Sequence, residues 1–214
     1  MKKTIHYLMA IALIATIFVG CKKGENDPFL SLLSRTARIT GVWNLSSADY
    51  DHIYTGDGDG TYSYSFDGTQ MTRTYDGDGI TYDYSEKVTI EKDGTFKIEI
   101  EEEDLFWNYN FESGQYESGV WKTTIEGVWY FLEGNSDLEV KDKERVEFLV
   151  ENYKEVNPDG ETEEISFSGK SNSYDQLILL DKLANKEMVS LYDYEESAGS
   201  ETYRETGTST YTRE

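Results

Sequence analysis

The sequence predicts an all-β fold, an antiparallel up-and-down β-barrel preceded by a short N-terminal helix. Three observations support this prediction. Apolar and polar residues alternate with period two from residue 41 onward. Turn residues divide that region into roughly nine to eleven segments, at the spacing of about 8–12 residues that is typical of sandwiches and barrels. No glycine-rich turn opens a convincing strand–helix–strand unit.

The first predicted element is a helix of one or two turns over Phe29–Arg38. Apolar residues recur there at near-helical spacing between Pro28 and Gly41. They are Phe29, Leu30, Leu32, Leu33 and Ala37. A second, brief helical turn is expected over Asp181–Met188, between apolar segments that read as strands.

Strands are predicted wherever ring-bearing or branched residues alternate with polar ones, because one face of each strand then points inward. Three stretches show this most clearly. Their apolar positions are Tyr62, Tyr64 and Phe66; Trp107, Tyr109 and Phe111; and Val146, Phe148 and Val150.

Three turn sequences are expected to reverse the chain between strands. Asp93-Gly94 separates two alternating stretches and suits a two-residue type I′ turn, in which both residues take positive φ. Asp67-Gly68 and the segment 157–160, Asn-Pro-Asp-Gly, carry the same kind of signal.

The N-terminus has the pattern of an export signal. Lys2 and Lys3 precede a nearly unbroken apolar run over residues 7–19, too short to span a bilayer. The run ends at Cys21, the sole cysteine, in a context that resembles the lipobox of bacterial lipoproteins. We therefore expect a signal peptide over 1–20, acylation of Cys21, a polar tether over 21–28 and a barrel domain over 29–214. The anchoring membrane is expected to be the outer membrane, and the sequence does not distinguish its periplasmic face from its surface face.

Charge and composition exclude several functions. The chain has 214 residues and a net charge of −22, and removal of Lys2 and Lys3 makes the exported part more negative still. Such a chain does not suit nucleic-acid binding, which needs clustered basic residues. One cysteine allows no intramolecular disulfide. Aromatic residues make up 14% of the chain, which argues against disorder.

No residue pattern points to catalysis. Beyond the signal peptide the only histidine is His52, expected in a solvated loop, and no Gly-x-Ser-x-Gly turn is present to position a nucleophile. Paired carboxylates can catalyse glycoside hydrolysis, but among 42 acidic residues some pairs lie close together by chance, so such pairs do not indicate an enzyme. We expect a protein that is not an enzyme and that has no cofactor apart from the covalent lipid.

Two Asp-Gly repeats allow two interpretations, a calcium site or ordinary turns. Asp57, Asp59, Asp76 and Asp78 resemble fragments of calcium loops, but neither repeat completes an EF-hand. Asp-Gly is also common turn chemistry, and we favour that interpretation.

A resemblance joins several of these features. The Cys21 motif, the polar tether and the helix lead into Gly41-Val42-Trp43, and later segments follow at residues 127–131 and 180–188. Together they look like the lipocalin-like lipoproteins of Gram-negative bacteria. In that family the tryptophan of Gly-x-Trp packs beneath an arginine of the last strand, which here implies Arg204 or Arg213 over Trp43. Trp43 as a plain core residue is the alternative.

The resemblance implies a barrel that binds or carries a small apolar or amphipathic ligand. Aromatic residues on predicted strands are candidates to line its cavity. They are Tyr62, Tyr64, Trp107, Tyr109, Trp129 and Phe131. The alternative is a barrel filled by its own side chains, serving as a structural or interaction module for protein, glycan or calcium. The protein partner and the ligand are left open.

Overall fold

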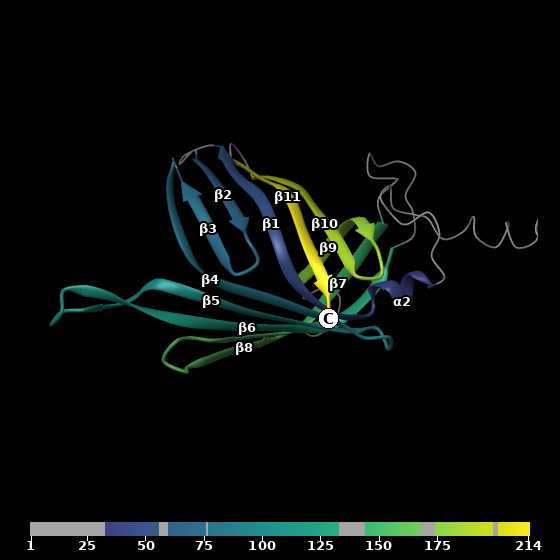
Figure 1. The fold of residues 1–214 in the computed structure, drawn as a ribbon, viewed down its shortest axis with the longest axis horizontal. Helices are drawn as coiled ribbons and strands as arrows, with labels where there is room; N and C mark the ends of the chain where they lie inside the picture. The colour runs from purple at the N-terminus through teal and green to yellow at the C-terminus, as the bar shows by residue number, and fades with distance from the viewer. Residues whose placement is uncertain (1–32, 56–59, 76, 133–143, 168–173, 199–200) are drawn as a thin grey trace, which may run out of the picture.

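The computed structural model describes residues 33–55, 60–75, 77–132, 144–167, 174–198 and 201–214. These residues form one short helix and eleven antiparallel strands in a single sheet (Figure 1). The elements are α2 (Arg35–Ile39), β1 (Gly41–Thr55), β2 (Gly60–Phe66), β3 (Gln70–Tyr75), β4 (Asp78–Ile90), β5 (Thr95–Asn110), β6 (Gln115–Phe131), β7 (Glu144–Val156), β8 (Thr162–Ser166), β9 (Tyr174–Leu183), β10 (Glu187–Ala198) and β11 (Glu201–Arg213). The predicted all-β barrel is confirmed.

The sheet closes on itself because β6 pairs with β7. At the end near α2, which we call the base, β1 pairs directly with β4 through Gly41–Asn44, so eight strands complete the ring there. Further up, the β2–β3 hairpin lies between β1 and β4. Additional strands widen a barrel. The opposite end, which we call the mouth, is therefore broader than the base.

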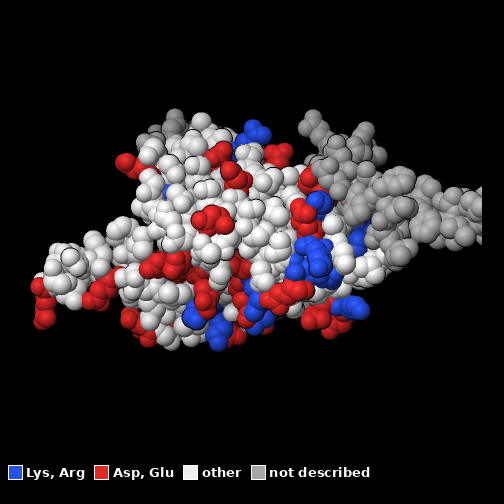
Figure 2. Space-filling view, in the orientation of Figure 1, with Lys and Arg blue, Asp and Glu red and all other residues white. Residues whose placement is uncertain are grey.

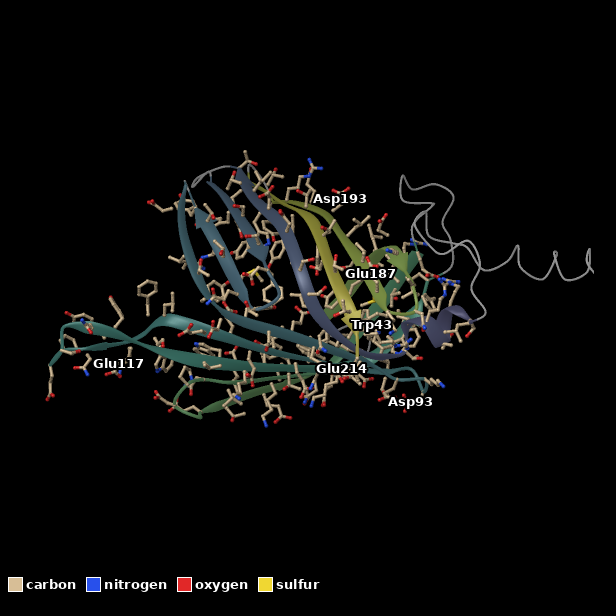
Figure 3. The ribbon with its side chains drawn as sticks, in the orientation of Figure 1. Trp43, Asp93, Glu117, Glu187, Asp193 and Glu214 are labelled. Atoms are coloured by element: carbon tan, nitrogen blue, oxygen red, sulfur yellow. The ribbon has the colours of Figure 1, made fainter. Side chains whose placement is uncertain are left out.

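The barrel also splays open on one side. The pairing of β4 with β5 stops at Tyr84 and Glu102, after which the upper part of β4 pairs only with β3. β5 and β6 instead continue as a long hairpin, whose outer part over residues 105–120 we call the arm (Figure 1). Figure 3 shows the difference: Trp43 and Glu214 lie at the base and Glu117 lies far out on the arm.

The buried core lies at the base. Alternating residues of β7 point inward, and Val146, Phe148 and Val150 are all buried, as their spacing predicts. α2 covers this end of the barrel: its Ile39 is fully buried, and Arg38 donates to the Leu183 carbonyl at 2.5 Å. Arg35 forms an ion pair with the buried Glu144 and lies 4.3 Å from the Phe131 ring.

Several local predictions need correction. α2 begins only at Arg35, after the N-cap Ser34, whereas the predicted helix began at Phe29; residues 29–32 lie outside the described part. Asp181–Met188 contains no helix, since β9 continues to Leu183 and a tight turn leads into β10.

The Asp93-Gly94 turn is longer than predicted. The Glu91 backbone N–H donates to the Thr95 carbonyl at 2.9 Å, so three residues form the loop, and its last residue, Gly94, has a φ of 92°. The Asp93 carboxylate accepts from the Thr95 backbone and hydroxyl, which fixes this conformation. The reversals at Asp67-Gly68 and at residues 157–160 lie where they are predicted.

Candidate functional site

The inward faces of the barrel strands enclose two spaces, one above the other. The lower cavity has a volume of about 120 Å³ and lies above the base. The mouth cleft has a volume of about 400 Å³ and lies where β4 separates from β5. On β5, Ile98 and Ile100 line the cavity, and the next inward residue, Glu102, lines the cleft. On β6, Ile125 lines the cavity and Thr123 lines the cleft.

The lower cavity is walled mainly by hydrocarbon. Its apolar lining comes from six strands and α2, and includes Ile98, Ile100, Ile125, Phe148, Leu180 and Met188. Four polar side chains interrupt this wall on one side: Glu86, Ser190, Tyr192 and Tyr211. The arrangement suits a small apolar body with one polar group.

Glu86 of β4 is the single acidic residue that lines the lower cavity within the described residues. Its carboxylate accepts a hydrogen bond from the Tyr211 hydroxyl at 2.8 Å and one from the Tyr84 hydroxyl at 3.0 Å, each on a different oxygen. Burial raises the pKa of this carboxyl, and the two tyrosine donors only partly oppose that shift. Burial also raises the pKa of Tyr84 and Tyr211, so both hydroxyls remain donors at neutral pH.

This raised pKa predicts how Glu86 affects stability. Below the ordinary glutamate pKa of about 4.3 the carboxyl is protonated in both folded and unfolded chains, and burial carries no charge penalty. As the pH rises through the raised pKa, the folded protein must ionise a buried group and loses stability relative to a neutral variant. We expect Glu86→Gln to be more stable than wild type by about 1–2 kcal/mol at neutral pH, and by less in acid.

Thermal unfolding across a pH series measures this difference. The matched control is Glu126→Gln, which removes an exposed carboxylate from the outer face of β6. If the difference in melting temperature between Glu86→Gln and wild type were the same at every pH, the carboxyl would carry no burial penalty.

The mouth cleft is acidic and partly apolar. Glu102, Glu103, Asp104 and Glu155 line it together with the single basic residue Arg73. Burial raises the pKa of the Glu102 carboxyl, an effect that Tyr82 and Arg73 partly oppose. The remaining lining includes Ile80, Leu105, Phe106 and Trp121. The cleft thus combines a hydrophobic surface with excess negative charge.

A series of rings continues up the inner face of β1 and its neighbours. The Tyr50 ring stacks on Tyr64 with centroids 5.0 Å apart, and His52 lies 4.9 Å from Tyr64 and 5.5 Å from Tyr203. His52 therefore sits in a strand among aromatic side chains, and its placement in a solvated loop was wrong. Its Nε2 atom lies 3.6 Å from a Glu205 carboxylate oxygen.

The Gly-x-Trp residues lie at the base. Trp43 is fully buried, and its Nε1 donates to the Ile39 carbonyl at 2.6 Å. The Arg213 guanidinium lies 5.2 Å from the Trp43 ring and donates to the Ala37 carbonyl at 3.3 Å. A Cβ atom on Gly41 would lie only 2.6 Å from the Arg213 Nε, so glycine leaves room for this arginine.

Arg204 does not lie at the base, so of the two arginines predicted to contact Trp43 only Arg213 does so. The antiparallel register places Arg213 opposite Trp43 but Arg204 opposite Ile53, far along β1. Arg204 is exposed, and its nearest acidic partner is Asp193 at 3.5 Å.

None of the six aromatic candidates for ligand contact is among the residues that line the lower cavity or the mouth cleft. Tyr64 belongs to the inner face of β2, and Tyr62 stacks on Tyr75 near the end of the same hairpin. Tyr109 lies exposed on the arm, and Trp107 packs against Trp121. The other two lie at the base: Trp129 is buried and donates to the Glu91 carbonyl, and its ring packs against Phe131.

Most of the remaining predicted site residues lie outside the described part of the chain. Cys21, Asp57, Asp59 and Asp76 lie outside the described residues. Asp78 is exposed at the end of β4, opposite Tyr75. Within the described part of the chain, no three His, Cys, Asp or Glu residues group as metal ligands.

Sequence reasoning missed Glu86, Glu102 and Tyr211. A signal for Glu86 was present: Val88 and Ile90 are apolar alternate residues of one strand, and counting back by two places Glu86 on the same inward face. The many acidic residues on outward faces hid this one.

Comparisons with known proteins add no relative. The chain matches no protein-family model, and no curated protein matches its sequence. Among the described residues, no helix has the length and hydrophobicity needed to cross a bilayer.

Proposed function

We propose that this is a lipid-anchored protein of the cell envelope, in the outer membrane, whose barrel binds a small apolar or amphipathic molecule without catalysis. The anchoring rests on the sequence around Cys21. The binding function rests on one observation: the lower cavity and the mouth cleft follow one another along the same inward strand faces, from apolar to polar. The mouth cleft, at about 400 Å³, lies within the range of about 300–1,000 Å³ that is usual for ligand pockets, and the lower cavity adds about 120 Å³ beneath it.

A second function, an interaction module, has its own supporting observation. Four aromatic residues of the arm are exposed and contact one another: Phe106, Tyr109, Phe111 and Tyr116. Phe111 is 89% exposed. Exposed aromatic clusters of this kind are found where proteins meet other macromolecules.

A variant that fills the mouth tests the binding function. The ring of strands is complete within residues 41–213, so a chain that begins at residue 24 retains all of it. We expect this chain to bind phenylnaphthylamine, a neutral apolar probe that fluoresces when it leaves water. Thr123→Trp places a large ring in the cleft and should weaken binding by about tenfold or more, which corresponds to ~1.4 kcal/mol.

The control is Thr124→Trp, the same change on the outer face of the same strand. It should leave the affinity unchanged. Absence of probe binding, or equal affinities for the two variants, would contradict a ligand site inside the barrel and leave the interaction module as the better proposal. Native mass spectrometry of the purified chain would then show whether any molecule co-purifies.

A further inference from the structure

The lower cavity contains a carboxylate with spare hydrogen-bonding capacity. A carboxylate offers about four acceptor positions. Glu86 uses one on each oxygen, for the hydroxyls of Tyr84 and Tyr211. Among the described residues, no Lys, Arg or His side chain forms an ion pair with it. The charge therefore faces the cavity with tyrosine support and no basic counterpart.

The rings around Glu86 suit a positive charge. Tyr192 and Tyr211 both line the cavity beside it. Burial raises the pKa of both phenols, so both rings stay neutral at physiological pH. Aromatic faces attract ammonium groups by about 0.5–2 kcal/mol, and a carboxylate with aromatic walls is a common way to bind organic cations.

The mouth cleft above the cavity has the same sign of charge as Glu86. The mouth cleft contains four carboxylate residues against one arginine. Acidic side chains also spread over the face of the barrel seen in Figure 2 and along the arm, while basic ones gather toward the α2 end and the lower strands. A negative field of this kind raises the local concentration of cations and repels anions such as fatty acids.

The rest of the cavity wall limits the shape of the ligand. Ile100, Ile125, Phe148 and Met188 surround the space opposite the carboxylate with hydrocarbon. A cavity of about 120 Å³ has room for a short chain or one small ring. A bare metal ion gains nothing from these side chains, whereas an alkyl tail does.

We propose that the barrel binds a small organic ammonium ion, with its charged head at Glu86 and its apolar tail among the isoleucines of β5 and β6. This proposal rests on the ligand-binding function and names the class of its ligand. The ammonium N–H groups donate to the free acceptor positions of Glu86. An anion of the same size is repelled by Glu86 and by the carboxylates of the mouth cleft. A neutral alcohol makes a weaker hydrogen bond to Glu86 than an ammonium ion does, because it carries no charge.

Three probes with the same six-carbon tail test this class. Hexylammonium, hexanol and hexanoate are titrated into the chain from residue 24 by calorimetry at neutral pH. We expect hexylammonium to bind about tenfold or more tightly than hexanol, and hexanoate to bind more weakly than both. This comparison uses the wild-type chain, so it does not depend on any variant folding.

Two variants locate the effect. Glu86→Gln should abolish the preference for hexylammonium over hexanol, because it removes the charge that only the ammonium ion uses. Glu101→Gln removes an exposed carboxylate from the outer face of β5, where it pairs with Lys122, and should keep the preference. Equal binding of hexylammonium and hexanol, or a preference that survives in Glu86→Gln, would overturn the proposed class. Phenylnaphthylamine binding that Thr123→Trp weakens would still support the ligand site, so the two proposals can fail separately.

Discussion

Trp43→Ala is expected to lower the free energy of unfolding by about 3–5 kcal/mol, the usual cost of removing a large aromatic side chain from a core. Trp43 is fully buried at the base, where α2 meets the closed ring of strands. Its removal leaves a cavity there, ends the contact with Arg213 and leaves the Ile39 carbonyl without its donor. Thermal unfolding should show a fall in melting temperature of about 6–20 °C.

Two further variants interpret this result. Trp43→Phe keeps an aromatic ring but loses the indole donor, so its stability should lie between those of wild type and Trp43→Ala. Phe111→Ala removes a ring that is 89% exposed on the arm and should leave the melting temperature unchanged. If Trp43→Ala melted with the wild type, neither the base contact with Arg213 nor a plain core role would describe this residue.

Gly127→Ala is expected to destabilise the barrel by about 3 kcal/mol, at the upper end for an overpacked site. Gly127 lies in β6 at a bulge, where the pairing with β7 shifts by one residue. A Cβ atom there would stand 2.0 Å from the Leu149 carbonyl oxygen and 3.0 Å from the Glu151 nitrogen. Both are backbone atoms, so the clash is relieved only by separating the two strands that close the ring.

Thermal unfolding and phenylnaphthylamine binding check this prediction together. Loss of the β6–β7 closure should lower both the melting temperature and the affinity, because β6 contributes to the wall of both spaces. Gly79→Ala is the matched control: its Cβ would meet the Thr74 hydroxyl at 3.5 Å, an ordinary contact. Equal melting temperatures for the two alanine variants would contradict the closure at Gly127.

Local patterns predicted much of the fold. Alternation placed the inward residues of β2 and β7 correctly, because the period of two is a property of the strand itself. The same pattern misjudged Trp107, Tyr109 and Phe111. Alternation separates the two faces of a strand but does not say whether anything covers one of them, and the arm extends beyond the rest of the barrel.

The candidate site was predicted less well, for a related reason. Tyr64 was recognised on an inward face, but the contact between Glu86 and Tyr211 joins β4 to β11, two strands that are distant in sequence. The same holds for the choice between Arg204 and Arg213. Both lie in β11, and only the register with β1 shows which of them meets Trp43.

The sequence by itself determined the β-rich class and the position of most turns, and it predicts an export-type N-terminus, since each of these inferences depends on residues close together in the chain. Tertiary structure alone decided which strand faces enclose space, how the added β2–β3 hairpin widens the mouth, and that a lone carboxylate faces an apolar cavity. These features depend on register and ring closure, which join residues more than a hundred positions apart, such as Glu86 and Tyr211. No local pattern carries that information, because the pairing of one strand is fixed only when all the others have found their neighbours.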